Sequence, residues 1–397
     1  MSPERDLSMT DDKLELYIFI DAFGWELLKR NQWFLEGLIT DRKPLETVFG
    51  YSSACVPSII TGEYPAAHGY WSSFYYSPRT SPFRTAAPWL KLLPGPLAER
   101  GRIRRYISAA LKKICGFSGY FNLYNVPFEY LPYFDYQEKE DIFAIDSLGG
   151  RQTVFGALRE QKAPLFIETR HSDAGKIESF IKAVRHGRPG FAYLHMGELD
   201  ALLHANGKTS GIVTKKLREY DNLIRTAYRE AGSRYKAVEL TVFSDHGMKD
   251  IEAPHDLVSE VEALGLGYGK DYIAFYDATM ARFWFLNDPA RNRIGSMLDR
   301  VKTGSVLSDA ELKSMGAYFP DHKYGELIFL MKPGILINPS FMGRKPVFGM
   351  HGYHPSDPDS CAMIIKNGPI PAHVNKITDV LKGRGIKADS RCCAMKA

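Results

Sequence analysis

The chain has 397 residues, of which 45% are hydrophobic and 24% are charged, and its net charge is +5. This is the composition of an ordinary globular protein. A net charge this small does not predict a nucleic-acid polymer as partner, and no run reaches the ~18 apolar residues of a membrane span. The five cysteines lack CxxC spacing, which argues against a zinc ribbon or a disulfide framework. Because residues 1–12 lack the apolar core of a signal peptide, we expect a cytoplasmic protein.

The first regular segment is a short apolar run over residues 14–20 that ends in Asp21. A segment with helical character follows it to about residue 34. A near-continuous apolar strand followed by a helix is the unit of a parallel α/β sheet. Such sheets bind ligands at the carboxyl ends of their strands, where Asp21 would lie. The alternative interpretation of Asp21 is an N-cap of the following helix.

A segment rich in hydroxyl groups comes next. Ser52 and Ser53 precede an apolar stretch that closes at Thr61 and Gly62. Serines in this position cap a helix, and the N–H groups of a helix N-terminus bind anions. A serine oxygen placed there would attack a phosphorus or sulfur centre while the adjacent N–H groups stabilise the developing oxyanion. The simpler interpretation is a cap without chemistry.

Residues 70–145 lack regular alternation of strands and helices, and we interpret them as an insertion that covers the active site as a lid. Within them, residues 100–113 carry six basic residues and no acidic one. Their helical spacing predicts a basic amphipathic segment, so residues 100–114 are either a solvated face or a peripheral membrane contact. Residues 117–136 contain nine aromatics, which would stack on a base or sugar, line a groove for an acyl chain, or pack a small core of their own.

Alternation resumes with helices predicted over residues 151–161, 174–185 and 210–231 and strands over 164–168, 191–196 and 238–244. The strand 191–196 leads to Asp200 and His204, which can bind one metal together if the backbone turns as a helix. The strand 238–244 ends in Asp245 and His246, and both can face one cleft if Gly247 lets the backbone bend away.

Residues 255–345 mix short strands (272–275, 281–285 and 326–331) with helices near 288–302 and 309–315, and we expect a smaller α+β lobe on the substrate side. His351 then stands between glycines, before a strand over 362–365 and a helix near 373–382. Repeats and linkers are absent from the sequence. We therefore expect one catalytic domain over residues 1–397.

The strand ends and the glycine-flanked histidine together supply six candidate metal ligands. They are Asp21, Asp200, His204, Asp245, His246 and His351. Mixed Asp and His ligands suit zinc, with manganese or iron as alternatives. Because six ligands are too many for one tetrahedral ion, they indicate two, and two ions ~4 Å apart form a clamp for in-line displacement at phosphorus.

These motifs, taken in order, resemble a known family. They are Ile-Asp21, the hydroxyl of Ser52, Glu63-Tyr-Pro-Ala-Ala-His-Gly, Asp200-x-x-x-His204, Ser-Asp245-His246-Gly-Met and Gly-x-His351-Gly-Tyr. The sequence resembles the type I phosphodiesterase and nucleotide pyrophosphatase family of the alkaline phosphatase superfamily over residues 15 to about 370. The resemblance implies an α/β three-layer sandwich with a mixed, mostly parallel central sheet, helices on both faces, and two zinc ions above its carboxyl edge.

Carried over by position, the resemblance also assigns roles. One metal would be held by Asp200, His204 and His351, and the other by Asp21, Asp245 and His246 together with Ser52. In place of the family's usual threonine, Ser52 would be the nucleophile and form a phospho-enzyme that water hydrolyses. Ser53 is the second choice for this role.

One position departs from the family pattern. Three residues after the nucleophile, an asparagine usually contacts a phosphoryl oxygen, and this chain has Cys55, a weaker donor. A sulfatase is less favoured, because Ile59 replaces the arginine of the sulfatase motif. The residues expected to contact substrate are Cys55, Tyr70, Trp71, Tyr75 and His354.

The predicted function is a zinc-dependent hydrolase that cleaves a phosphodiester or pyrophosphate bond of a small-molecule, lipid or glycan phosphoester. The first alternative is a transferase in which a lipid or glycan hydroxyl replaces water. The second is a binding module that holds metal without turnover.

Overall fold

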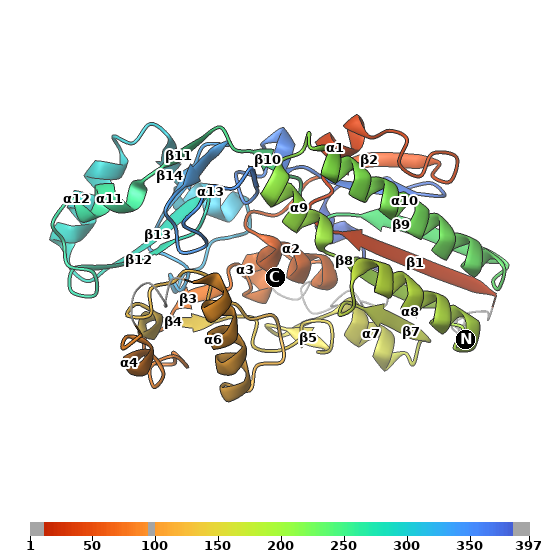
Figure 1. The fold of residues 1–397 in the computed structure, drawn as a ribbon, viewed down its shortest axis with the longest axis horizontal. Coiled ribbons are helices and arrows are strands. Elements are labelled where there is room, and N and C mark those ends of the chain that lie inside the picture. The colour runs from red at the N-terminus through yellow and green to blue at the C-terminus, as the bar shows by residue number, and fades with distance from the viewer. Residues whose placement is uncertain (1–11, 94–99, 384–397) are drawn as a thin grey trace, which may run out of the picture.

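A central six-stranded sheet organises the molecule, for which the computed structural model describes residues 12–93 and 100–383 (Figure 1). The strands lie in the order β2-β18-β9-β1-β8-β7. Their bounds are Lys13–Ile20 for β1, Asp41–Leu45 for β2, Leu165–Glu168 for β7, Phe191–Met196 for β8, Ala237–Phe243 for β9 and Ala362–Lys366 for β18.

The centre of this sheet is parallel. Strand β1 pairs in parallel with both β8 and β9, and Ile20 lies opposite Met196 while Phe19 lies opposite Phe243. Strand β7 continues the parallel set beside β8, whereas β18 is antiparallel to β9 and to β2. The predicted mixed, mostly parallel sheet is therefore confirmed. Because β1, β8 and β9 are in register, the residues that follow them emerge at the same edge.

Both faces of the sheet are covered by helices, as alternate side chains of its strands require. Leu16 and Ile18 of β1 face a core that includes α1 (Trp25–Arg30), α8 (Asp173–His186), α9 (Glu198–Asn206) and α10 (Gly211–Gly232). Tyr17 and Phe19 face the other core, which includes α2 (Ser52–Thr61) and α7 (Val154–Glu160). This arrangement is the predicted three-layer sandwich.

A second, four-stranded antiparallel sheet lies at the other end of the long axis (Figure 1). It contains β12 (Tyr272–Tyr276), β13 (Met280–Phe285), β15 (Leu327–Met331) and β14 (Gly304–Val306), and α11 (Leu257–Glu262), α12 (Asp288–Leu298) and α13 (Asp309–Ser314) accompany it. The segment 70–145 contributes β3 (Phe74–Tyr76), α4 (Ala87–Leu90), α6 (Gly101–Ile114) and β4 (Phe134–Tyr136). Most of its aromatics pack in one hydrophobic cluster with the four-stranded sheet.

The remaining elements are short. They are α3 (Pro65–His68), η1 (Leu131–Tyr133), β5 (Ser147–Leu148), β6 (Arg151–Gln152), β10 (Lys249–Asp250), β11 (Ala253–His255), β16 (Ile335–Ile337), β17 (Gly349–Met350), η2 (Pro358–Ser360) and η3 (Ile377–Asp379). The helix expected near residues 373–382 is wrong, because that stretch holds only the single turn η3. There, Asp379 accepts hydrogen bonds from the backbone N–H groups of Asn375 and Lys376. Within the described ranges, no helix has the length and apolar character needed to cross a membrane.

Candidate active site

The first candidate metal group forms at the carboxyl ends of β1 and β9. Ligand atoms of Asp21, Asp245 and His246 lie within 4.8 Å of one another. The backbones of the loops that follow β1 and β9 are in close contact. A Cβ atom added to Gly24 would lie only 2.3 Å from the Cα of Gly247. The expectation that Gly247 frees the backbone to bend needs correction, because its φ is not positive. Gly247 is required instead because a side chain would collide with the backbone.

The second group forms where α9 follows β8. Ligand atoms of Asp200, His204 and His351 also lie within 4.8 Å of one another. Asp200 and His204 are one helical turn apart on α9, so their side chains share a face, as expected for a helix at this position. His351 comes from the loop after β17. The two groups adjoin, because the rings of His246 and His351 stack with centroids 3.8 Å apart.

Hydrogen bonds to the backbone orient two of the imidazoles. The Nδ1 atom of His204 lies 2.8 Å from the carbonyl oxygen of Gly349, and that of His246 lies 2.9 Å from the carbonyl oxygen of Gly247. A carbonyl oxygen only accepts, so each Nδ1 carries a proton, and Nε2 is the ring atom that would bind a metal. This is the way in which proteins fix histidines as metal ligands.

The carboxylates of both groups fit bound cations. Among the described residues, Oδ1 of Asp21, Oδ1 of Asp200 and Oδ2 of Asp245 are buried without a hydrogen-bond partner. Each faces a histidine Nε2, at distances of 3.6, 3.2 and 3.2 Å. Burial, followed by repulsion from Asp245 and Asp200, raises the pKa of Asp21 well above its ordinary value. Buried carboxylates of this kind are stabilised when they coordinate metal.

Ser52 is the first residue of α2, and its Oγ lies 3.0 Å from Nε2 of His246. The first N–H groups of a helix have no partner within the helix, so this end of α2 can bind an anion. The neighbouring Ser53 instead lies with its Oγ 3.5 Å from the carbonyl oxygen of Trp71. Of the two candidate serines, Ser52 is therefore the one that contacts the metal groups.

A cavity of about 1140 Å³ opens in front of these residues. The six-stranded sheet, the segment 70–145 and the lobe 255–345 all contribute to its wall. Its lining includes Ser52, Asp21, Asp200, His204 and His351. Four aromatic residues of the segment 70–145 also line it: Phe74, Tyr120, Tyr124 and Phe143. The nucleophile candidate, the group around Asp200, and Asp21 thus face one shared space, whereas Asp245 and His246 lie outside its lining.

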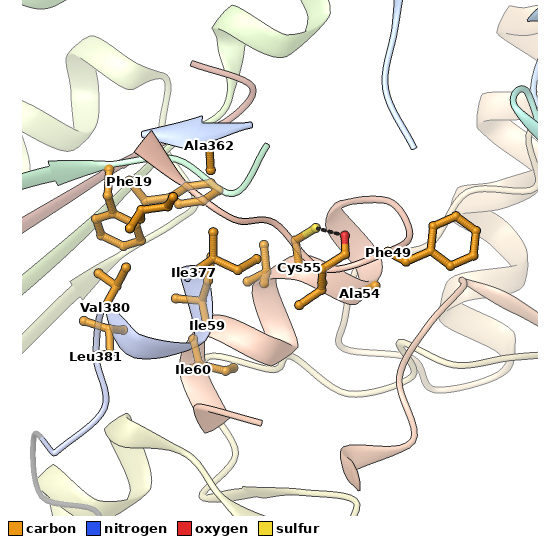
Figure 2. Packing of buried hydrophobic residues seen from close by; sticks show 14 of the residues in the cluster. Phe19, Phe49, Ala54, Cys55, Ile59, Ile60, Ala362, Ile377, Val380 and Leu381 are labelled. Carbon is orange, nitrogen blue, oxygen red and sulfur yellow. Dashed lines mark hydrogen bonds between the residues drawn. The ribbon is translucent and has the colours of Figure 1, made fainter. Parts of the chain in front are cut away.

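Cys55 and Trp71 do not contact this space, and the expectation that they bind substrate is wrong. Cys55 is fully buried on α2, in the hydrophobic cluster that also contains Ile59, with its sulfur 3.6 Å from Oγ1 of Thr47 (Figure 2). Trp71 is also buried, and its Nε1 donates to the carbonyl oxygen of Phe49 at 2.7 Å. Both positions are fixed by packing of the core.

The other three expected contacts also lie outside the cavity lining. The hydroxyl of Tyr75 donates to Oδ2 of Asp135 at 3.1 Å. The backbone N–H of Tyr70 donates to Nδ1 of His68 at 3.2 Å, and Nδ1 of His354 lies 2.6 Å from Oγ of Ser356. The side chains of Tyr75 and His354 therefore bond to residues outside the cavity lining.

Sequence reasoning missed several residues of the wall: Lys112, Glu138, Arg170, Asp277 and Asn338. Arg170 follows β7 at the same sheet edge as Asp21, so the rule of strand ends would have found it. Glu138 accepts from Oγ of Ser73 at 3.2 Å, and burial raises its pKa to about 7 despite that hydrogen bond. Asp277 and Asn338 belong to the lobe, and no local signal points to them.

Known proteins share this arrangement of elements. The sequence pattern of the family described as type I phosphodiesterase / nucleotide pyrophosphatase matches residues 16–353. No curated protein sequence matches the chain. Among solved structures, murine ectonucleotide pyrophosphatase / phosphodiesterase 5 is 14% identical with a TM-score of 0.61, and the human protein is 12% identical with a TM-score of 0.63. Both comparisons cover 90% of this chain and 88% of the other.

The murine protein also matches as an inactive variant with a threonine replaced by alanine, in complex with AMP. That structure is 13% identical over the same shares of both chains, with a TM-score of 0.61. At these identities the likeness shows an alkaline-phosphatase-like fold, while the sequence pattern covers most of the chain. The chain belongs to the type I phosphodiesterase / nucleotide pyrophosphatase family.

Proposed function

We propose that the protein is a two-metal phosphohydrolase that cleaves a phosphodiester or pyrophosphate bond through a covalent phospho-serine at Ser52. The observation that carries the proposal is the position of Ser52 Oγ, 3.0 Å from His246 Nε2 at the N-terminus of α2. A hydroxyl nucleophile also agrees with the murine relative, whose inactive form has lost a threonine hydroxyl.

The two groups of ligands would hold the metals: Asp21, Asp245 and His246 with Ser52, and Asp200, His204 and His351. Their mixed oxygen and nitrogen donors favour zinc, with manganese or iron as alternatives at one site. When bound, such ions neutralise charge on the phosphoryl group and lower the pKa of a hydroxyl or a water.

The residues of the chain supply the rest of the reaction. Ser52 Oγ forms a bond to phosphorus while the bond to the leaving oxygen breaks, and the leaving group departs with the electron pair and takes up a proton. The N–H groups at the start of α2 bind a phosphoryl oxygen. Water then breaks the bond between Ser52 and phosphorus, which restores the hydroxyl and releases the product.

A small nucleotide-type substrate is the first choice for the ester. An inactive variant of the murine relative has been solved in complex with AMP, and the cavity of about 1140 Å³ has room for such a molecule beside Tyr120, Tyr124 and Phe143. Aromatic side chains of this kind stack on bases. A cytoplasmic location belongs to the same proposal, and the free cysteines Cys55, Cys115 and Cys361 are compatible with it.

Apolar side chains in the cavity lining favour a second candidate, a transferase that passes the phospho group to a lipid or glycan acceptor. These side chains are Val56, Leu336, Ile337, Met342 and Val347. Product analysis in the presence of an added alcohol distinguishes the two reactions. Phosphoryl transfer to the alcohol supports the transferase, and products of water alone reject it.

Replacement of the two serines tests the proposed nucleophile. In Ser52→Ala, hydrolysis of an aryl phosphodiester should fall by at least about 10³-fold, because the nucleophile is lost, while bound zinc measured by elemental analysis largely remains. The control Ser53→Ala should stay within about tenfold of the parent. Equal turnover by Ser52→Ala and the parent contradicts the proposal. Bound zinc without turnover of any mono- or diester favours the binding module.

A further inference from the structure

Exposed apolar side chains gather on the two helices of the insertion. Trp89 is 75% exposed and Leu92, which follows α4, is 75% exposed, while Tyr106 and Ile114 on α6 are 76% and 79% exposed. These values exceed those of every other large apolar side chain in the described part of the chain; the next, Phe348, is 66% exposed. An exposed apolar patch of this kind marks an interaction surface.

The same helices carry an excess of positive charge. Arg102, Arg105 and Lys113 are exposed on α6, and no salt bridge involves them within residues 12–93 and 100–383. Residues 100–113 include no acid, and Lys91 is the only charged residue of 86–93. Arg104 has a different role, because it is buried and donates to the carbonyl oxygens of Tyr124 and Val126.

The inner faces of the two helices hold this surface in place. Leu90 of α4 and Ile107 and Leu111 of α6 pack in the same hydrophobic cluster as the four-stranded sheet. Both helices are therefore fixed on one side to the body of the protein. Their outer residues remain exposed because no described segment covers them.

We propose that the outer faces of α4 and α6 dock on an anionic lipid bilayer. Trp and Tyr combine an apolar ring with a polar tip and prefer the membrane interface. Arg and Lys near the surface are attracted by acidic headgroups. A bilayer satisfies both features together, whereas a neutral apolar partner would leave the cations without counter-charges.

Docking would also fix the orientation of the cavity relative to the bilayer. Lys112 of α6 and Tyr120, six residues after the end of that helix, both line the cavity that holds Ser52. A bilayer held against α4 and α6 therefore lies beside the cavity mouth, where a phosphoester headgroup can enter. This last step rests on the proposed function, while the docking itself does not.

Vesicle binding tests the proposal without turnover. The full chain is mixed with phosphatidylcholine vesicles that contain or lack phosphatidylserine and is sedimented at low and at high salt. We expect binding that requires phosphatidylserine and weakens at high salt. Failure of the parent protein to bind overturns the proposal, as does equal binding to neutral vesicles at high salt.

Two patch variants and one control locate the surface. Reversal of three charges in Arg102→Glu, Arg105→Glu and Lys113→Glu should weaken binding by about a hundredfold or more, and Trp89→Ser with Tyr106→Ser should weaken it by at least about tenfold. The control, Ile212→Ser with Lys215→Glu on α10, removes one exposed apolar group and one exposed cation elsewhere and should bind like the parent. Full binding by both patch variants, or equal loss in the control, overturns the assignment.

A soluble aryl phosphodiester separates this proposal from the proposed function. Both patch variants should hydrolyse it at the rate of the parent, which also shows that they fold. Turnover by a parent that binds no vesicles rejects the docking and leaves the function standing. Vesicle binding without turnover rejects the proposed function and leaves the docking standing. A patch that brings two copies of the chain together, detected as a concentration-dependent dimer without vesicle binding, also overturns the lipid assignment.

Discussion

Two carboxylates of the centre, those of Asp21 and Asp245, carry charge that the protein by itself does not fully compensate. Both face Nε2 of His246, at 3.6 and 3.2 Å. Despite burial, the neighbouring His204 lowers the pKa of Asp200. Burial and the neighbouring carboxylates raise the pKa of Asp21, so its charged form is unfavourable in the metal-free protein. The same arrangement becomes favourable when a divalent cation lies between the carboxylates and the imidazoles.

Asp21→Asn tests this charge balance in chelator-treated protein. The variant should be more stable than the metal-free parent, because an amide removes a buried carboxylate that its neighbours repel. A carboxyl group whose pKa is raised in the folded state does not lower the free energy of unfolding at a pH below its ordinary pKa near 4. It lowers that free energy most at a pH above the raised pKa. The advantage of the variant in urea unfolding should therefore grow as pH rises from about 4.

Asp299→Asn is the matched control for this measurement, because Asp299 is exposed at the end of α12. It should change the free energy of unfolding by less than ~0.5 kcal/mol. If metal-free Asp21→Asn protein is less stable than the parent at every pH, the charged carboxylate of Asp21 does not destabilise the folded state.

At the scale of elements, the position of α9 decides the second metal group. Asp173, the first residue of α8, accepts hydrogen bonds from the backbone N–H groups of Gly197 and Glu198 at 3.2 and 2.9 Å. In return, the side chain of Glu198 accepts from the backbone N–H of Asp173 at 2.9 Å. The N-termini of α8 and α9 therefore cap each other, which places Asp200 at the cavity.

Asp173→Ala should loosen this junction. Asp173 is fully buried and pairs with the buried Lys176 at 2.9 Å. Removal of one partner of a buried ion pair costs ~3–5 kcal/mol, measured by denaturant unfolding of the zinc-loaded protein. Zinc affinity should fall as well, because α9 carries two of the proposed ligands.

Asp288→Ala gives the comparison, because Asp288 is an exposed acid in the first turn of α12. Its loss should cost no more than ~1 kcal/mol and leave zinc affinity unchanged. Rescue by Asp173→Asn, which keeps an acceptor for the α9 backbone, should restore part of the zinc affinity. Unchanged affinity in Asp173→Ala would show that α9 holds its position without this contact.

On the scale of the whole molecule, the six proposed ligands tie together segments from residue 21 to residue 351. Three parallel strands, one helix and one loop meet at the centre, and the lobe and the insertion complete the cavity wall. Metal bound there would link these segments in the folded state only. Binding and folding are coupled at such a site.

Removal of metal should therefore lower the Tm of the whole protein. A site saturated at about a thousand times its Kd contributes ~4 kcal/mol to stability, so a chelator should produce a clear downward shift that added zinc reverses. Differential scanning calorimetry, with elemental analysis of each sample, measures the shift. An unchanged Tm in protein shown to have lost its metal would mean that the ligands do not join the segments.

Much of the site followed from local patterns. Apolar runs that end in Asp21 and in Asp245-His246 mark buried parallel strands, and Asp200 and His204 follow another strand at helical spacing. Because parallel strands in register end at one edge, the sequence by itself determined that these side chains would meet. The helical start at Ser52 was also predicted from the hydroxyl groups before an apolar stretch.

Contacts between segments far apart were decided by the tertiary structure alone. Cys55 and Trp71 are adjacent to the nucleophile segment in sequence, yet packing against Thr47 and Phe49 turns them into the core. Asp277 and Asn338 reach the cavity from the segment 255–345. In the segment after residue 373, the backbone N–H groups of Asn375 and Lys376 donate to Asp379 where a longer helix was expected. Local sequence sets hydrophobic periodicity and capping, whereas the side on which a residue is buried depends on which distant surface fills the space beside it.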